Sequence, residues 1–406
     1  MIAYHDALRV ISDLIQPRSL DVETVSLGSA VGRVCADDIQ ARVDNPPFHN
    51  TAMDGFAVRL SDFKAARFPE PFMLPLSGIV AAGQGVEGLD FERGCWQVMT
   101  GAAIPFDTDS VVPIEDVQVT ADRVIFASLP KAGAHIRRAG EDFKFGSPLV
   151  QRGQYLTPLQ ILPLATAGVP ALRVYKKPKI LFLSTGDEVI DDPAMALGPG
   201  QIYNSNGPFA QSYLQALGAE VYAIHALRDD PSMFAKTLVD AQSNGFDLIV
   251  SSGAVSAGTY DFVNEALQTI GAEILYHKVR IKPGKPNLLA HLPSGIPYFG
   301  LPGNPVATAV GLRFFVREAL RVLQRQPPEK PLFAHCMTSL SKKSGLHLIL
   351  KCVLNHTENG QVSFEILDGQ ESFKTRPFLT MNAWAHIPED YSEIVQNDLF
   401  EVYPAI

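Results

Sequence analysis

The residues best suited to chemistry on an anion form a loop at 251–261, which reads Ser-Ser-Gly-Ala-Val-Ser-Ala-Gly-Thr-Tyr-Asp. The loop follows the run 247–250 and precedes a helical pattern. Small residues let backbone N–H groups approach a phosphate, and a helix N-terminus adds roughly half a positive charge. Gly253 and Gly258 have the spacing of a Walker loop, but Thr259 stands where that motif needs Lys. The closer Gly-x-Gly pair of the dinucleotide fingerprint is also missing, so the loop indicates an anion site of another lineage.

Carboxylates that follow predicted strands form a second group. They are Asp187 with Glu188, Asp229 with Asp230, and Asp261. Because parallel strands end at one edge of a sheet, these carboxylates are expected to converge on a hard cation such as Mg²⁺. The alternative is that each is a separate helix cap, since Asp is a preferred N-cap residue. Three sets at successive strand ends favour the metal site.

A cluster of cations lies at 278–286 of this acidic chain. Lys278, Arg280 and Lys282 are predicted on one face of an extended run, and Lys285 follows a Pro-Gly turn. A rigid turn fixes where ammonium groups point, which favours binding of an anion. The alternative is a solvated strand edge protected by lysines.

The segment 300–306, Gly-Leu-Pro-Gly-Asn-Pro-Val, reads as a strand end, a turn and a helix start. Asn304 is the expected N-cap, and Pro305 is the expected first helical residue. Pro302 precedes them in the turn. At the carboxyl end of a strand, the same turn would also form a wall of a ligand crevice.

Two further segments are predicted to be structured turns. The first, 45–58, enters a strand through Asp54 and Gly55, and the second, 137–142, ends in the acidic pair Glu141 and Asp142. The histidines show no metal-ligand spacing and are interpreted as structural.

Composition bounds the class of protein. With 406 residues and 46% hydrophobic content, the chain is expected to form roughly two to four domains. The net charge of -9 argues against a large nucleic-acid footprint. Four cysteines without a Cys-x-x-Cys pair favour a reducing cytoplasm over a disulfide framework or a structural zinc site. No signal peptide is expected, and the longest uncharged stretch, 153–172, contains three prolines, so no membrane segment is expected.

The pattern of apolar and polar residues changes three times along the chain. An amphipathic helix is predicted at 4–15, followed by short β-rich runs at 95–99, 110–113 and 123–127. Apolar runs then alternate with helical stretches between 179 and 324, which predicts a doubly wound, mostly parallel α/β sheet. After the Pro-rich segment 326–331, short alternating runs predict a small C-terminal β-barrel or sandwich of ~75 residues.

Taken together, the motifs resemble the molybdopterin molybdenumtransferases, the family of bacterial MoeA and the gephyrin E domain. The matching segments occur in the family's order and cover most of the first ~325 residues. They are 52–55, 100–102, 140–142, 184–188, 204–206, 282–286 and 300–305.

The resemblance implies insertion of molybdate into adenylated molybdopterin, with release of AMP and the help of Mg²⁺. It also implies a homodimer, with the molybdopterin adenylyltransferase as a candidate partner. The implied units are 1–44 with 144–177 (an elongated linker and dimerisation domain), 45–143 (small and β-rich), 178–326 (α/β, molybdenum-cofactor-binding type) and 327–406 (C-terminal barrel).

Residue roles also follow from the resemblance. Asp54, Thr100 and Asp142 would face the substrate from the partner subunit, while Glu188, Asp229 and Asp261 would form the catalytic and metal region. The residues implied to hold phosphates, the oxyanion or the rest of the substrate are Ser252, Gly253, Ser256, Gly258, Lys278, Lys282, Lys285, Pro302, Asn304 and Pro305.

The chain departs from the family pattern in places. Ala254 replaces the second Gly of the usual Ser-Gly-Gly-Val-Ser, at a cost of about 1 kcal/mol if a left-handed backbone is needed there. In the tail, Leu346, Lys351 and the Arg376-Pro377 step replace family arginines and a Ser-rich turn. These departures leave two alternatives: a non-catalytic dimeric scaffold, or a divergent paralogue that binds molybdopterin without insertion activity.

Overall fold

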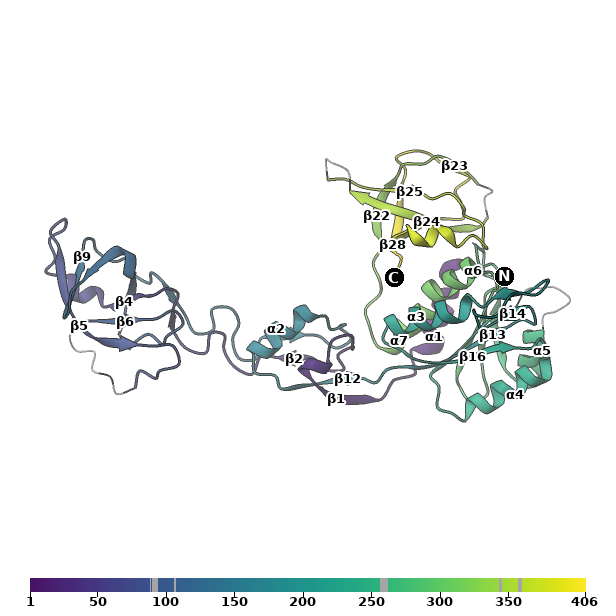
Figure 1. Cartoon of the computed structure of the whole chain (residues 1–406), viewed down its shortest axis with the longest axis horizontal. Coiled ribbons are helices and arrows are strands. Elements are labelled where there is room, and N and C mark those ends of the chain that lie inside the picture. The colour runs from purple at the N-terminus through teal and green to yellow at the C-terminus, as the bar shows by residue number, and fades with distance from the viewer. Residues whose placement is uncertain (88, 90–93, 106, 256–261, 343–344, 357–359) are drawn as a thin grey trace.

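The computed structural model describes residues 1–406 apart from 88, 90–93, 106, 256–261, 343–344 and 357–359. The chain is elongated. A β-rich unit forms one end, a slender middle unit follows, and an α/β unit with an adjoining barrel forms the other end (Figure 1). The chain passes through the middle unit twice, and the two passages meet where β1 (Val22–Ser26) pairs with β12 (Ala171–Tyr175).

A six-stranded mixed sheet forms the centre of the α/β unit, in the order β16-β13-β17-β21-β20-β18. Its strands are β13 (Lys179–Thr185), β16 (Glu220–Leu227), β17 (Leu248–Ser252), β18 (Glu273–His277), β20 (Leu288–His291) and β21 (Pro297–Leu301). The first four strands in that order are parallel, and β20 is antiparallel to both β21 and β18. β18 therefore runs in the same direction as the parallel strands, and five strands end at one edge of the sheet.

Helices pack on both faces of this sheet, because successive side chains of a strand point to opposite faces. Along β13, Ile180 and Phe182 join one buried cluster, whereas Leu181 and Leu183 join another. The first cluster contains α1, α3, α6 and α7, and the second contains α4 and α5. The helices are α1 (Tyr4–Ile15), α3 (Asn206–Ala216), α4 (Pro231–Gln242), α5 (Phe262–Thr269), α6 (Pro305–Val310), the π-helical η4 (Gly311–Val316) and α7 (Arg317–Leu323).

The helix expected to start at Pro305 forms as a contiguous run of α6, η4 and α7. Its middle third is a π-helix, a rare form that places one extra residue in the turn. All six residues of that segment are buried.

The C-terminal part forms the expected barrel. Five strands pair in the order β24-β25-β22-β28-β26, and β26 pairs back to β24, which closes the ring. The strands are β22 (Leu332–Cys336), β24 (His347–His356), β25 (Val362–Ile366), β26 (Ala383–Ile387) and β28 (Leu399–Pro404). β19 (Ile281–Lys282) joins β24, so the cationic segment 278–286 connects the sheet to the barrel. Shorter elements are β23 (Leu340–Ser341), β27 (Glu393–Ile394) and η5 (Arg376–Leu379).

The β-rich unit holds a six-stranded sheet in the order β7-β4-β6-β5-β9-β8. Its strands are β4 (Gly55–Val58), β5 (Phe72–Val80), β6 (Cys95–Val98), β7 (Ser110–Pro113), β8 (Val117–Val119) and β9 (Arg123–Phe126). Short elements beside it are β3 (Asn50–Thr51), β10 (Ile136–Arg137), η2 (Leu60–Phe63) and η3 (Ile114–Asp116). The middle unit contains β1, η1 (Leu27–Ser29), β2 (Ile39–Gln40), β11 (Pro148–Val150), α2 (Pro158–Thr166) and β12.

The structure differs from the sequence-based expectations in three respects. The sheet is mixed, because β20 is antiparallel to its neighbours. Lys278 has φ 76°, so the predicted extended run is broken at its first cation. The segment 1–44 is divided, because α1 packs against α7 and η4 in the α/β unit, whereas β1 and β2 lie in the middle unit.

The four cysteines are buried free thiols. Among the described residues, no helix combines the length and apolar character needed to span a membrane.

Candidate active site

The ends of five strands place the predicted anion-binding residues at one edge of the α/β sheet. The register runs across the sheet from His277 to Leu288, Gly300 and Ser251. The residues that follow these strands therefore lie along the same edge, including Lys278 after β18 and Gly253 after β17, with β21 and β20 between those two strands. The sheet edge is the candidate active site.

The described part of the cradle loop, 253–255, is tightly packed. Gly253 has φ 102°, and an added Cβ would lie 2.5 Å from Thr185 Oγ1. Its N–H donates to the Leu301 carbonyl at 3.0 Å. Ala254 has φ 50°, so the residue that replaces the family's second glycine adopts a left-handed conformation. The predicted Ser256, Gly258 and Asp261 lie outside the described residues.

Ser252 lies at the end of β17 and is only 2% exposed. Its carbonyl accepts a hydrogen bond from Thr185 Oγ1 at 3.2 Å, which ties the end of β17 to the end of β13. Gly303, after β21, approaches so closely that an added Cβ would lie 3.5 Å from Gly253 Cα. Three strand ends thus meet around the cradle.

The carboxylates divide into two kinds. Asp230 is a helix cap, because its Oδ1 accepts from the N–H groups of Ser232 and Met233 at 2.8 and 3.1 Å. Asp229 is different. Burial raises its pKa, and the negative charges of Asp187 and Glu188 raise it further. Its backbone N–H also lies 3.4 Å from Asp187 Oδ1.

These acids match the donor chemistry of a hard cation, since Mg²⁺ binds carboxylate oxygens and the crowded negative charge is uncompensated. The described residues hold no group of three His, Cys, Asp or Glu arranged to bind a metal ion. The third predicted ligand, Asp261, is outside the described residues. The described acids therefore form part of the predicted set.

The lysines lie beside the cradle. Lys282 and Lys285 are exposed on the turn 282–285, and an added Cβ on Gly284 would lie 3.6 Å from the Ala307 carbonyl of α6. Lys278 is half-buried, and its N–H donates to the Asn287 carbonyl at 2.9 Å. Arg280 pairs with Glu389 of the barrel through Nε at 3.1 Å. Arg280 therefore connects two units, and the lysines remain as candidate anion ligands.

The turn after β21 closes another side of the site. Asn304 is the N-cap residue of α6 and is exposed, and its side chain makes no cap hydrogen bond. Pro305 starts the helix, as expected. The Pro302 carbonyl accepts from Thr308 Oγ1 at 2.6 Å. The exposed Asn304 amide therefore lies at the rim of the candidate site.

Sequence reasoning gave no individual role to two asparagines near the start of α3. Asn206 Nδ2 donates to the Gly303 carbonyl at 2.8 Å. Asn204 Nδ2 contacts Ser184 Oγ at 3.2 Å and Asp191 Oδ1 at 2.7 Å. Both side chains brace the loops of the edge. The sequence signal that could have indicated this role is their position between a short strand and a helix.

The barrel also reaches this edge, through the loop 369–375. The Ser372 carbonyl accepts the Val306 N–H at 3.0 Å, in the first turn of α6. Lys351, 0% exposed, holds the loop: its Nζ donates to the carbonyls of Gly369 at 2.6 Å and Lys374 at 3.1 Å. Lys351 is therefore occupied by backbone carbonyls, and Arg376 is exposed at the end of the loop.

Asp54, Thr100 and Asp142 lie elsewhere. Asp54 precedes β4 and Thr100 follows β6, at the end of the chain opposite the α/β unit (Figure 1). Asp54 Oδ1 accepts from the N–H and the hydroxyl of Thr100 at 2.6 and 2.7 Å. Asp142 Oδ2 accepts from Asn45 Nδ2 at 2.8 Å. Within one chain these residues do not meet the sheet edge.

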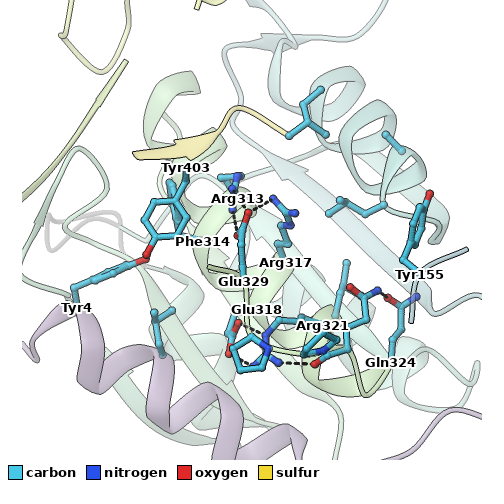
Figure 2. A pocket seen from close by; sticks show the side chains of 18 residues that line it. Tyr4, Tyr155, Arg313, Phe314, Arg317, Glu318, Arg321, Gln324, Glu329 and Tyr403 are labelled. Atoms are coloured by element: carbon cyan, nitrogen blue, oxygen red, sulfur yellow. Dashed lines mark hydrogen bonds and ion pairs between the residues drawn. The ribbon is translucent and has the colours of Figure 1, made fainter. Parts of the chain in front are cut away.

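A large cavity, of about 640 Å³, lies away from the sheet edge. Figure 2 shows it between α1, α7, the segment 326–329 and Tyr403 of the barrel. None of the predicted site residues that the structure describes lines it. The volume of this cavity therefore does not identify it as the active site.

Comparisons with known proteins agree with the arrangement of the units. The family model described as the MoeA N-terminal region (domains I and II) matches residues 2–168. The model described as a probable molybdopterin binding domain matches residues 181–322. A mixed α/β sheet with the predicted anion-binding residues at its carboxyl edge, together with these matches, defines a protein of molybdenum cofactor biosynthesis.

Full-length relatives narrow the class. The chain is 38% identical to a molybdopterin molybdenumtransferase of Synechococcus elongatus, over 96% of both chains. It is 33% identical to one of Haemophilus influenzae, over 96% of this chain and 95% of the relative. The crystal structure of a MoeA protein of Pyrococcus horikoshii superposes with a TM-score of 0.83 and 27% identity, over 99% of both chains. The chain belongs to the molybdopterin molybdenumtransferase family.

Proposed function

We propose that this enzyme inserts molybdate into adenylated molybdopterin and releases AMP in a Mg²⁺-dependent reaction. The observation that carries the proposal is the convergence of a Gly-rich cradle, an acidic cluster and exposed lysines at one sheet edge. Adenylated molybdopterin carries a pyrophosphate and molybdate is a tetrahedral dianion, so both substrates suit such a site.

Each group of residues has a role in this proposal. Lys282 and Lys285 neutralise the phosphates, and the backbone N–H groups after Gly253 bind anionic oxygens. Asn304 donates from the rim of the site. Glu188, Asp229 and Asp261 would hold Mg²⁺, which when bound offsets the negative charge of the cleaved pyrophosphate.

We also propose that the active site is shared by two subunits of a homodimer. Asp54, Thr100 and Asp142 lie too far along the elongated chain to reach their own sheet edge, so a partner is the natural target (Figure 1). The middle unit offers a surface for pairing: Leu159 and Leu162 of α2 are 79% and 74% exposed. Apolar side chains on one helix are typical of a surface that another subunit covers.

The test is AMP release from adenylated molybdopterin in the presence of molybdate and Mg²⁺. We expect activity from the wild type and its loss in Asp54→Ala, Asp229→Asn and Asp261→Ala. Asp230→Asn is the matched control. Asp230 is the neighbour of Asp229 but has no proposed ligand role, and Asn at this position preserves the cap of α4. Loss of activity in this control would indicate general damage to the loop.

Mixing two inactive variants tests the shared site. A heterodimer of Asp54→Ala and Asp229→Asn would contain one site with both residues intact. Random exchange would then restore about a quarter of the wild-type activity. No recovery from subunits that do exchange would mean that each chain works alone.

A wild type that binds molybdopterin but releases no AMP would favour the alternatives, a dimeric scaffold or a divergent paralogue. We further propose a cytoplasmic location, in keeping with four buried free thiols. The molybdopterin adenylyltransferase is the proposed source of substrate, since an enzyme that adenylates molybdopterin makes the compound that the proposed reaction consumes.

A further inference from the structure

The cavity in Figure 2 lies at the junction of three units. α1 contributes Tyr4 and Leu8, the barrel contributes Tyr403, and Tyr155 comes from the middle unit. The remaining walls are the η4–α7 helix and the segment 326–329. Its volume of about 640 Å³ is within the range of small-molecule sites.

The cationic wall of this cavity has one arginine that shares its carboxylate partner with another. Arg313, with its side chain 2% exposed, is fully engaged: it binds both oxygens of Glu329 at 2.9 and 2.8 Å, and the Pro404 carbonyl. Arg317 Nη1 lies 3.3 Å from the same carboxylate. That nitrogen is buried, whereas the Arg317 side chain as a whole is 27% exposed, so part of it remains accessible.

Two guanidinium groups one helical turn apart thus share one carboxylate. Burial lowers the pKa of Arg317, and the neighbouring charge of Arg313 lowers it further. The third arginine, Arg321, is satisfied by Glu318 at 2.6 and 2.7 Å. Three arginines and two glutamates line the cavity, which leaves an excess positive charge beside Arg317.

Part of the cavity wall is apolar. Leu8 and Leu320 lie in the cavity wall, and the exposed rings of Pro327 and Pro328 form part of its rim. A site with one partly accessible guanidinium and apolar side chains in its wall favours a ligand with an anionic head and a short apolar body.

We propose that this cavity binds a small amphipathic anion, a carboxylate or a phosphate monoester, with its head on Arg317 and its apolar part against Leu8 and Leu320. Such a ligand bridges the α/β unit, the barrel and the middle unit. The site is separate from the proposed active site, so its test needs no catalytic activity.

The probes are hexanoate, hexyl phosphate and the uncharged hexanol, titrated calorimetrically into the full-length protein. At least one anion should bind at least about tenfold more tightly than hexanol, since a charge-assisted hydrogen bond is worth that factor. The stronger of the two anions identifies the head group. Equal affinity for all three probes, or no binding at ~10 mM, would overturn the proposal.

Variants locate the site. Arg317→Met should reduce the affinity for the anion about tenfold and leave hexanol unaffected. If this variant is poorly folded, Pro327→Glu places a repelling charge on the exposed rim and should weaken only the anion. Lys330→Met is the matched control, because Lys330 is exposed nearby but does not line the cavity. Anion affinity that survives both Arg317→Met and Pro327→Glu would place the binding elsewhere and refute the assignment.

Discussion

The carboxylate of Asp54 is held by a single residue, Thr100, which donates both its backbone N–H and its hydroxyl to the same oxygen, Oδ1. The backbone hydrogen bond, and next the hydroxyl, lower the pKa of Asp54 from 3.8. Thr100 thus fixes Asp54 in its charged form and in one orientation.

Thr100→Val removes the hydroxyl and keeps the N–H. The pKa of Asp54 should therefore rise toward its ordinary value, because one of its two stabilising hydrogen bonds is lost. Since the native pKa is depressed, the stability from this contact is present above pH ~4 and is lost as the pH falls through the native pKa. Carbon-detected NMR titration of the carboxyl measures the shift. Thr100→Ser, which keeps the hydroxyl, should leave the pKa nearly unchanged, and an equal shift in both variants would contradict this account.

Two buried histidines connect the barrel to α1. His347 Nε2 and His386 Nδ1 are 3.0 Å apart, and the ring of Tyr4 lies 4.6 Å from that of His347. Burial lowers the pKa of His347 from 6.5 to about 3 and holds that of His386 well below its ordinary value. Both imidazoles are therefore neutral in the folded protein near neutral pH.

This pair should make the barrel sensitive to acid. Below pH 6.5 the unfolded imidazoles bind protons while the folded ones stay neutral, so stability falls with pH until the native pKa is reached. Each histidine contributes about 1.4 kcal/mol per pH unit. Urea unfolding at pH 7 and pH 5, followed by Trp384 fluorescence in a Trp96→Phe background, measures the slope.

The double substitution His347→Phe with His386→Leu should flatten that pH dependence. Replacing both partners with apolar side chains leaves no buried polar group unpaired, so stability at pH 7 should change little. His335→Phe is the control, since His335 is on the exposed side of the barrel. An unchanged slope in the double variant would show that other groups titrate.

The cradle loop offers a matched pair of backbone substitutions. Ala254 has φ 50°, where a Cβ is strained, so Ala254→Gly should stabilise the protein by about 1 kcal/mol. Gly253→Ala should destabilise it by about 1–3 kcal/mol, because its Cβ would lie 2.5 Å from Thr185 Oγ1 at φ 102°. Urea unfolding monitored by circular dichroism measures both. A loss of stability in Ala254→Gly would show that the alanine methyl is needed for packing.

Local patterns predicted much of the α/β unit. Continuous apolar runs identified β13, β17 and β21, because strands buried on both faces need apolar side chains at every position. Cap signals located the helix starts: Asp230 before Pro231 and Asn304 before Pro305 begin α4 and α6. These elements carry their own signals in the sequence.

Other features depend on contacts distant in the sequence. The direction of β20 is set by its pairing with β21, and no residue of β20 encodes it. The left-handed Lys278 arises where the chain leaves β18, with its N–H held by Asn287. The separation of Asp54 from the sheet edge is a matter of overall shape (Figure 1). Sequence motifs could name these residues but could not place them.

The contacts of Lys351 give it a structural role. Its buried Nζ donates to the carbonyls of Gly369 and Lys374, while Gln370 Oε1 accepts the N–H of Lys351 at 3.0 Å. Lys351→Met would leave the loop carbonyls without a donor. We expect the barrel to lose about 1–3 kcal/mol and the loop 369–375 to lose its order against α6.

Lys374→Met is the matched control for Lys351→Met. Lys374 Nζ pairs only with the exposed Glu371 at 2.9 Å among the described residues, and such surface pairs contribute about 0–1 kcal/mol. Urea unfolding and hydrogen exchange at the Val306 amide, which donates to the Ser372 carbonyl, measure stability and loop order separately. Faster exchange at Val306 in Lys351→Met, but not in Lys374→Met, would establish that the buried ammonium group orders the loop at the sheet edge. Equal protection in both variants would show that the hydrogen bonds of Gln370 suffice to order it.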